Sequence, residues 1–211
     1  MNEYWESRFK EEGAMWKFDP SDSAIFALDF FRANKISAIL IPGFGYGRNA
    51  KLFYDHGLNV TGIEISESAI TLAKNNAINC KVHHGSVTDM PFDNDFYDGI
   101  FCYALLHLLN QSERRNFLKS CFRQLRTGGF MIFVVASKQM SMYGDGKFIS
   151  KDRFEISDGL KVYFYESASI QNEFANFGLI KFADMEEPIK FEKGHDPMKL
   201  ILVICKKSEN Y

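Results

Sequence analysis

The chain has 211 residues, of which 46% are hydrophobic, so it is long and apolar enough for one domain with a substantial core, and intrinsic disorder is excluded. Its 25 basic and 27 acidic residues give a net charge of −2 without a basic block, so the electrostatic footprint of a nucleic-acid binder is missing. The 4 cysteines show no CxxC spacing, which indicates reduced thiols. The polar start is no signal peptide, and the apolar runs are too short to span a bilayer, so we expect a soluble cytoplasmic protein.

The first two thirds of the chain alternate between helix-like and strand-like segments. Helical spacing of apolar residues predicts helices over 2–12, 21–34, 66–76 and 111–126. Short apolar runs predict strands over 37–41, 58–65, 80–85, 96–103 and 130–136. Ser66 is expected to cap the third helix, and Gly128 with Gly129 to end the fourth. Because strands and helices alternate, we expect a parallel sheet with right-handed crossovers.

After residue 137 the pattern changes. The segment 153–166 predicts a hairpin around Asp158 and Gly159. Ser167 is expected to cap a helix that ends at Gly178, and the runs LIKFADMEE and KLILVICKK predict two closing strands. No repeat, linker or low-complexity stretch is visible in the sequence, so we expect a single α/β domain.

The stretch ILIPGFGYGRN (39–49) carries three glycines at alternate positions, Gly43, Gly45 and Gly47. Such a turn after the first strand lets backbone amides approach a ligand at the carboxyl edge of the sheet, where ligands bind in open α/β sheets. A turn that merely needs glycine is the alternative. Pro42 fixes the chain direction into the turn, and its missing N–H costs nothing at a strand end.

Two classes of nucleotide ligand compete for this turn. A dinucleotide fingerprint has the form G-x-G-x-x-G, and Arg48 stands at the third glycine position, where it is too bulky for close helix–strand packing. The observed G-x-G-x-G spacing is that of nucleosides bound without a pyrophosphate, which argues against NAD and FAD. Glu64 ends the second strand about 20 residues after the glycines, where an acid accepts hydrogen bonds from ribose hydroxyls.

Four segments, in order, resemble the class I S-adenosylmethionine-dependent methyltransferases. ILIPGFGYGRNA is similar to their glycine motif, GIEIS to the ribose-binding strand end, HHGSVTDMPFDNDFYDGIFCYALLHLL to the adenine loop and fourth strand, and RQLRTGGFMIFVV to the next helix, turn and strand. The resemblance is strong over about residues 35–136 and looser elsewhere. It implies a Rossmann-like, doubly wound α/β fold with a seven-stranded sheet, mostly parallel with an antiparallel last strand.

The resemblance also implies S-adenosyl-L-methionine as the cofactor, without a metal. Gly43 and Gly45 would line its methionine and sulfonium part, Glu64 would accept hydrogen bonds from the ribose diol, and Ile65 would pack on adenine. Many members have Asp where this sequence has Ser86, which weakens the expected contact with the adenine amine. The expected cofactor site consists of Trp16, Gly43, Phe44, Gly45, Glu64, Ile65, Ser86, Val87, Cys102 and Tyr103.

The glycine motif departs from the family at Ile41, where an acid often stands. The PG-x-G form with an apolar residue there resembles the thiopurine and thiol methyltransferases and the tellurite-resistance type. The N-terminal segment of this chain also resembles that of these enzymes. It carries an aromatic cluster that consists of Tyr4, Trp5, Phe9, Trp16 and Phe18. We expect this cluster to form a lid, with Trp16 near the sulfonium, whose charge an aromatic face attracts. Covering the sheet edge is the alternative.

The expected single domain is therefore divided into three parts. They are an N-terminal helical lid over 1–35, a cofactor-binding core over 36–136, and a substrate-side insertion with closing strands over 137–211.

The residues after the fourth strand, FCYALLHLL, face the methyl group in the family. The Asn/Asp-Pro-Pro-aromatic tetrad of amide and base N-methylating enzymes is absent, as is the glutamate pair of arginine methyltransferases. Cys102 follows Phe101 instead of a proline, so a core thiol is expected for its side chain and not a cytosine-C5 nucleophile. These features favour a small-molecule acceptor, such as a thiol or a chalcogen oxyanion, and neither nucleic acid nor membrane as a partner.

His107 is the candidate catalytic residue, as general base for a hydroxyl or amine acceptor, because imidazole titrates near neutral pH. Structural packing is the alternative for His107, and His195 is a second candidate at the rim of the site. Two other functions stay open for the chain: an NAD-type oxidoreductase and a cofactor-binding domain without catalysis.

Overall fold

The computed structural model describes residues 2–190, 194 and 196–209, so His195 lies outside the described residues. Its centre is a seven-stranded sheet with the order β3-β2-β1-β4-β5-β10-β9. The strands are β1 (Ala38–Pro42), β2 (Asn59–Glu64), β3 (Lys81–His84), β4 (Tyr97–Tyr103), β5 (Leu125–Ala136), β9 (Leu179–Glu187) and β10 (Met198–Lys206). Strands β1 to β5 pair in parallel, whereas β10 is antiparallel to both of its neighbours. The expected fold class is confirmed.

Six α-helices and three 3₁₀ turns connect these strands in the described chain. They are α1 (Asn2–Glu12), α2 (Asp22–Ala33), α3 (Arg48–Asp55), α4 (Glu67–Asn75), α5 (Gln111–Gln124), α6 (Ser167–Phe174), η1 (Val87–Asp89), η2 (Leu106–Leu108) and η3 (Ala175–Phe177). The expected cap at Ser66 is present, since its side chain accepts a hydrogen bond from the Ala69 amide at 3.1 Å. None of the helices in the described part of the chain is long and apolar enough to cross a membrane.

Two predicted boundaries are wrong. Helix α5 ends at Gln124, and Gly128 and Gly129 lie inside β5 instead of stopping the helix. The reason is pairing beyond the end of β10: the Gly128 amide donates to the Lys207 carbonyl at 2.7 Å, and the Lys207 amide donates to the Gly129 carbonyl at 3.0 Å. In α6 the N-cap position is Glu166, whose amide donates to the Ser169 hydroxyl at 2.9 Å, so Ser167 is the first helical residue.

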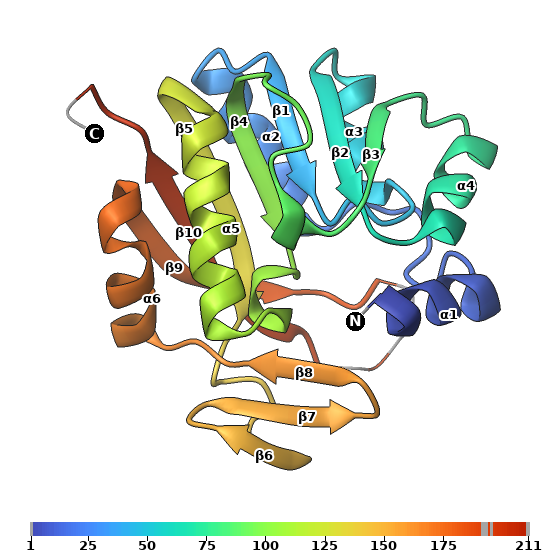
Figure 1. Ribbon diagram of the computed structural model, residues 1–211, viewed down its shortest axis with the longest axis vertical. Helices are drawn as coiled ribbons and strands as arrows, with labels where there is room; N and C mark the ends of the chain where they lie inside the picture. Colours follow the sequence, from blue (N-terminus) through green and yellow to red (C-terminus); the bar gives the residue numbers. More distant parts are fainter. Residues whose placement is uncertain (1, 191–193, 195, 210–211) are drawn as a thin grey trace.

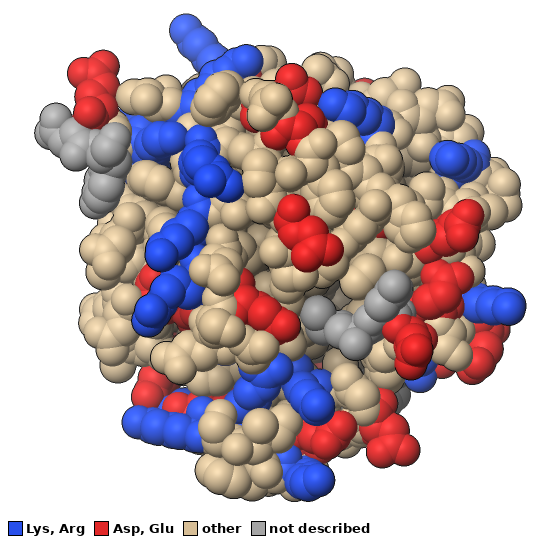
Figure 2. Space-filling view, in the orientation of Figure 1, with Lys and Arg blue, Asp and Glu red and all other residues tan. Residues whose placement is uncertain are grey.

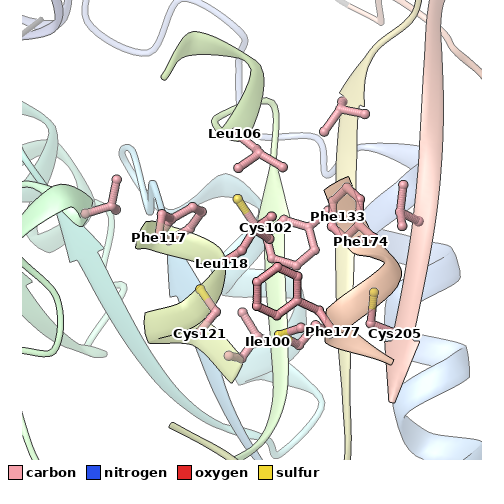
Figure 3. Packing of buried hydrophobic residues seen from close by; sticks show 14 of the residues in the cluster. Ile100, Cys102, Leu106, Phe117, Leu118, Cys121, Phe133, Phe174, Phe177 and Cys205 are labelled. Atoms are coloured by element: carbon pink, nitrogen blue, oxygen red, sulfur yellow. The ribbon is translucent and has the colours of Figure 1, made fainter. Parts of the chain in front are cut away.

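The core consists of two layers, one on each face of the sheet, and β5 contributes to both. Met131, Phe133 and Val135 pack with α5 and α6 on one face, whereas Ile132 and Val134 pack with α2 and α3 on the other. Figure 3 shows the first of these layers, in which the ring centre of Phe133 lies 6.2 Å from that of Phe117 on α5 and 5.4 Å from that of Phe174 on α6. Because both faces are covered, the strand is continuously apolar, as the sequence predicted.

A second, three-stranded antiparallel sheet lies beyond the carboxyl ends of the parallel strands (Figure 1). It consists of β6 (Lys147–Ser150), β7 (Arg153–Ser157) and β8 (Leu160–Tyr163). The predicted hairpin is β7–β8, and β6 is an edge strand that the sequence analysis did not predict. The chain returns to the main sheet where the Tyr165 amide donates to the Ala136 carbonyl at 2.8 Å. This hydrogen bond holds the insertion over the carboxyl edge of the parallel strands, where the residues expected to bind the cofactor lie.

Candidate active site

A cavity of about 400 Å³ lies at the carboxyl edge of the parallel strands, enclosed by α1 and by β8 of the insertion. Its lining contains His107 and nine of the ten residues expected for the cofactor. These nine are Trp16, Gly43, Phe44, Gly45, Glu64, Ile65, Ser86, Val87 and Tyr103. Residues from four separate strand ends therefore meet in one place, as the carboxyl ends of parallel strands do.

The three glycines of the turn between β1 and α3 serve different purposes, although all have positive φ angles of 72°, 57° and 81°. A Cβ atom on Gly47 would lie 2.9 Å from the side chains of Ile78 and Phe44, and one on Gly43 would lie 3.2 Å from Leu105. On Gly45 the nearest atom is on Phe9, at 3.9 Å. Gly45 is therefore the position where the missing side chain leaves open space in the cavity.

The Glu64 carboxylate, at the end of β2, is 5% exposed and is held by three backbone amides. One oxygen, Oε1, accepts hydrogen bonds from Ile65 at 2.9 Å and Ser66 at 2.8 Å, and Oε2 accepts from Gly45 at 2.6 Å. Burial raises the pKa of this carboxyl group, and the three amides act against that rise. Because each oxygen has two lone pairs, Oε2 keeps one for a ligand hydroxyl.

The adenine side expected from the sequence lies beside Glu64. Ile65, Ser86 and Val87 all line the cavity. The Ser86 hydroxyl, however, accepts from the Thr88 amide at 3.2 Å and lies 2.8 Å from the Thr88 hydroxyl, because Ser86 caps η1. Ser86 therefore has little capacity left for an adenine amine, which agrees with the departure from Asp noted in the sequence.

The N-terminal aromatic cluster covers the glycine turn. The ring of Trp16 stacks on that of Tyr46 at 15° and 6.2 Å, and Phe9 meets both rings edge-on at 6.0 Å. The Tyr46 hydroxyl accepts from the Trp16 amide at 3.1 Å and donates to the Lys17 carbonyl at 2.6 Å, which fixes the segment to the turn. Trp5, Phe9 and Trp16 all line the cavity, so the cluster forms one of its walls.

Cys102 is the expected site residue that the structure does not bring to the cavity. Successive side chains of β4 alternate between the sheet faces. Phe101 and Tyr103 point toward the α2 and α3 layer, whereas Cys102 is fully buried in the α5 and α6 layer. Burial raises the pKa of the Cys102 thiol. The Cys102 side chain is thus the core thiol that the sequence favours, and it does not line the cavity as the list of cofactor residues expected.

Tyr103 carries a hydroxyl that is buried in the cavity lining without a hydrogen-bond partner among the described residues. The Arg48 guanidinium lies 5.5 Å from the centre of its ring and also lines the cavity. From the sequence, Arg48 was predicted only to hinder dinucleotide binding, and its place in the cavity lining was not predicted. Arg48 directly follows Gly47, the last glycine of the turn, and this position indicates that its side chain lies near the ligand.

His107, in η2, is buried, and its Nδ1 lies 3.1 Å from the Ala136 amide, which donates to it. Nδ1 is therefore an acceptor, so the neutral ring carries its proton on Nε2. Burial lowers the pKa of His107 to about 4, which keeps the ring neutral near pH 7. The lone pair that a general base needs is engaged by the backbone, so the ring offers the cavity an N–H donor.

Glu187, at the end of β9, is a lining residue that the sequence analysis did not single out. It is 2% exposed, and its carboxylate accepts from the amides of Asp22 at 2.6 Å and Ser23 at 3.1 Å, and from the Ser23 hydroxyl at 2.8 Å. The carboxylate thus satisfies the amino end of α2, where a negative charge is stabilised. No periodic or motif signal in the acidic DMEEP stretch distinguishes this acid from its exposed neighbours.

Comparison with known proteins agrees with this geometry. Residues 39–129 match a protein family described as a methyltransferase domain. A ubiquinone biosynthesis O-methyltransferase of Coxiella burnetii is 28% identical over 109 residues, which cover 50% of this chain and 46% of that protein. The match spans less than half the length of the curated relatives.

Solved structures share the fold over nearly the whole chain. A protein of echinomycin biosynthesis, studied for the conversion of a disulfide bond into a thioacetal group, has a TM-score of 0.77 at 17% identity, covering 100% of this chain and 93% of that one. The 1,6-didemethyltoxoflavin N1-methyltransferase of Burkholderia thailandensis has a TM-score of 0.74 at 14% identity, covering 99% and 87%. TehB of Haemophilus influenzae has a TM-score of 0.66 at 14% identity, covering 97% and 67%.

Residues 39–129 match a methyltransferase domain, and the chain shares the fold of solved S-adenosylmethionine-dependent methyltransferases. S-adenosyl-L-methionine is therefore the cofactor against which the cavity is tested. The residues present fit that group. Gly45 leaves open space where a larger residue would intrude, Glu64 keeps one acceptor position for a ribose hydroxyl, and Trp16 supplies an aromatic wall.

Proposed function

We propose that this protein transfers the methyl group of S-adenosylmethionine to a small-molecule acceptor, and that the acceptor is a soft nucleophile, such as a thiol or a chalcogen oxyanion. One observation carries the choice of acceptor. The carboxylates and the imidazole that line the described cavity, Glu64, Glu187 and His107, already accept hydrogen bonds from backbone amides. Glu64 keeps one acceptor position, which the ribose of the cofactor would take, Glu187 is bound to the amino end of α2, and Nδ1 of His107 is engaged, so each of these three groups already has another role.

The cofactor, when bound, supplies a methyl group on a positively charged sulfonium, which is already a good electrophile. The protein must then align the acceptor with that methyl group and exclude water. A hydroxyl or amine acceptor must lose a proton and therefore needs a base. A thiol is already partly ionised near neutral pH, and an oxyanion arrives without a proton. The absence of an available base among the described lining residues thus favours these two classes.

The wall opposite the glycine turn supports the same choice. It consists of apolar side chains from η2, the end of β5, the following loop and β8, namely Leu108, Ala136, Met140, Met142 and Val162. Methionine side chains are flexible and polarizable, and they adapt to ligands of irregular shape. An apolar wall also removes water from the acceptor, which makes a soft anion more nucleophilic. His107 Nε2–H would donate to the acceptor atom or to a group beside it.

The relatives do not select among acceptors, because their names include an O-methyltransferase and an N1-methyltransferase. The test is therefore a substrate panel of thiols, selenite, tellurite, catechols and small amines, scored by the release of S-adenosylhomocysteine. We expect turnover with thiols or the chalcogen oxyanions. Turnover confined to catechols or amines would contradict the soft acceptor, and turnover confined to protein or nucleic acid would contradict the small-molecule class.

A further inference from the structure

A second concave surface lies on the far side of β8 from the candidate active site. Leu160 and Val162 line the active-site cavity, whereas the alternating residues Lys161 and Tyr163 line an open groove of about 1290 Å³. The other walls of the groove come from α5, α6 and the β6–β7 turn. Because the two hollows face opposite sides of one strand, the groove is separate from the expected cofactor and acceptor positions.

This groove concentrates positive charge, although the chain as a whole has a net charge of −2. Its lining contains six cationic side chains and three carboxylates, which are Arg114, Arg115, Lys119, Lys151, Arg153 and Lys161 against Asp152, Glu166 and Glu173. Figure 2 shows Lys and Arg side chains over α5 and again around the β6–β8 sheet at the bottom of the view, with carboxylates interspersed.

All three carboxylates of the groove are already paired. Glu173 accepts from Arg114 Nε at 2.8 Å and from the Tyr165 hydroxyl at 2.7 Å. Asp152 and Glu166 each lie 3.0 Å from the ammonium group of Lys138. The cations of Arg115, Lys119, Lys151 and Lys161, in contrast, form no ion pair within the described residues. The unpaired charge of the groove is therefore positive.

Two guanidinium groups, those of Arg114 and Arg153, are buried at the base of the groove, and Arg153 adds its charge to this excess. Arg153 is 9% exposed, and its Nη1 and Nη2 donate to the carbonyls of Leu109 at 2.7 Å and Leu108 at 3.3 Å. No carboxylate is paired to it in the part of the chain that the structure describes. Arg114 donates to the same Leu109 carbonyl at 3.2 Å and lies 4.0 Å from the centre of the Tyr163 ring. Burial and the charge of Arg114 lower the pKa of Arg153. Glu173 balances the charge of Arg114, so the charge of Arg153 remains for an anion in the groove.

We propose that this groove is a binding site for a soluble ligand that carries two or more phosphate groups. Guanidinium groups bind phosphate oxygens through two parallel hydrogen bonds, and the surrounding lysines add point charges. The cations come from α5, from the β6–β7 turn, and from β7 and β8, so a single phosphate group would reach only some of them. Neutral donors from Asn110, Asn172 and Ser169 line the same groove and suit the remaining oxygens. This inference does not rest on the acceptor proposed for the active site.

The test is isothermal titration of the full chain with inorganic tripolyphosphate at low ionic strength. We expect saturable binding, which the variant Arg115→Gln/Lys119→Gln/Lys161→Gln weakens at least tenfold because it removes three unpaired charges that surround the ligand. Raising the salt concentration should weaken binding to the parent more than to the variant, since exposed charges are screened. A shift of the unfolding temperature with tripolyphosphate is a second readout.

A matched control removes three exposed cations that lie outside the groove, in the variant Lys10→Gln/Lys74→Gln/Lys181→Gln. This control should bind tripolyphosphate as the parent does. Equal weakening in both variants would show a diffuse field without a site and would overturn the proposal. So would the absence of binding to the parent, or binding to phosphatidylglycerol vesicles without binding to tripolyphosphate.

Discussion

At the scale of single residues, the candidate site is made of polar groups that hold one another in place before any ligand arrives. Glu64 connects the glycine turn to the end of β2 through its bond with the Gly45 amide. His107 connects η2 to β5 through the Ala136 amide. Both groups were predicted as ligand or catalytic residues, and in the structure both also satisfy buried backbone donors. Their replacement should therefore affect stability as well as function.

Replacement of Glu64 by alanine tests this double role. The Glu64→Ala change removes the acceptor of three amides and of the expected ribose hydroxyl. A hydrogen bond to a charged group contributes about 1.5–3 kcal/mol, so S-adenosylhomocysteine affinity should fall roughly tenfold or more. The unfolding temperature without ligand should fall as well. Calorimetric titration and a thermal melt measure both, with the exposed neighbour Glu67→Ala as control, and unchanged affinity would show that Glu64 does not contact the cofactor.

Gly45 and Gly47 are expected to differ when each is replaced by valine. Gly45 faces open space in the cavity, so Gly45→Val should abolish cofactor binding, and the strain at its positive φ should lower stability moderately. Gly47→Val should instead destabilise the fold strongly, because its side chain would overlap Ile78 and Phe44. Thermal melts and cofactor titration separate the two effects. Full cofactor binding by a folded Gly45→Val variant would be the contrary result.

His107 gives a prediction with a pH signature. Its folded pKa of about 4 lies below the ordinary value of 6.5, so the unfolded chain binds the proton more tightly than the folded one. The contribution to stability is therefore complete above pH 6.5 and is lost as the pH falls toward 4, with a slope of up to about 1.4 kcal/mol per pH unit. Urea unfolding at several pH values should show this slope, and the slope should be smaller in His107→Asn.

The same variant addresses the role of His107 in turnover. The Asn oxygen can replace Nδ1 as acceptor for the Ala136 amide, but asparagine cannot act as a base. We expect turnover of a thiol to change by no more than a few-fold in His107→Asn. A loss of several hundred-fold, with the pH dependence of kcat removed, would instead identify His107 as the general base.

Among the secondary-structure elements, α1 is linked to the amino end of α4 by a carboxylate. Glu6 accepts from the hydroxyls of Ser66 at 2.7 Å and Ser68 at 2.6 Å, at the amino end of α4. These hydrogen bonds, with that of Ser68 the strongest, lower the pKa of Glu6 to about 2. A sequence scan gives no hint of this contact, because Glu6 lies in a charged run and its partners are 60 and 62 residues away.

The Glu6 contact predicts how the N-terminal lid responds to pH. Because the folded pKa is depressed, the contact is fully present above about pH 4.5 and is lost as the pH falls toward 2. Both tryptophans of the chain, Trp5 and Trp16, lie in this segment, so their accessibility to acrylamide reports its docking. Glu6→Gln should raise that accessibility at pH 7, whereas the exposed Glu11→Gln should not. Equal quenching in Glu6→Gln and the parent would contradict the anchoring role.

The strands differ in what they contribute to stability. Phe133 on β5 is fully buried between the sheet, α5 and α6, and Phe133→Ala should cost about 3–5 kcal/mol of unfolding free energy. Phe148 on β6 is 66% exposed, and Phe148→Ala should cost under about 0.5 kcal/mol. Denaturant titration compares the two variants, and similar losses would show that the β6–β8 sheet carries more of the fold than its burial indicates.

At the scale of the whole molecule, the repeated strand–helix order of the sequence predicts the sheet because each β-α unit carries local signals. The continuous apolar run of β5 and the cap at Ser66 are examples. These local signals do not predict a boundary that depends on pairing between distant segments. Gly128 is an example, because its hydrogen bond with Lys207, just after β10, makes it part of β5. The local signals also leave open whether Cys102 faces the cavity or the core, since the face of a strand cannot be assigned within an apolar run. The role of Glu187 and the groove beyond β8 could not be predicted, because both arise from contacts between segments that are distant in the sequence.

Calorimetric titration of the protein with S-adenosylhomocysteine and, separately, with NAD tests whether the cavity is a methyltransferase site. The G-x-G-x-G turn, Arg48 at the position of the third dinucleotide glycine, and the single acceptor position left on Glu64 predict that S-adenosylhomocysteine binds. NAD should give no saturable heat under the same conditions. Binding of NAD at comparable affinity, or no binding of S-adenosylhomocysteine to the folded protein, would contradict the assignment of this cavity as a methyltransferase site.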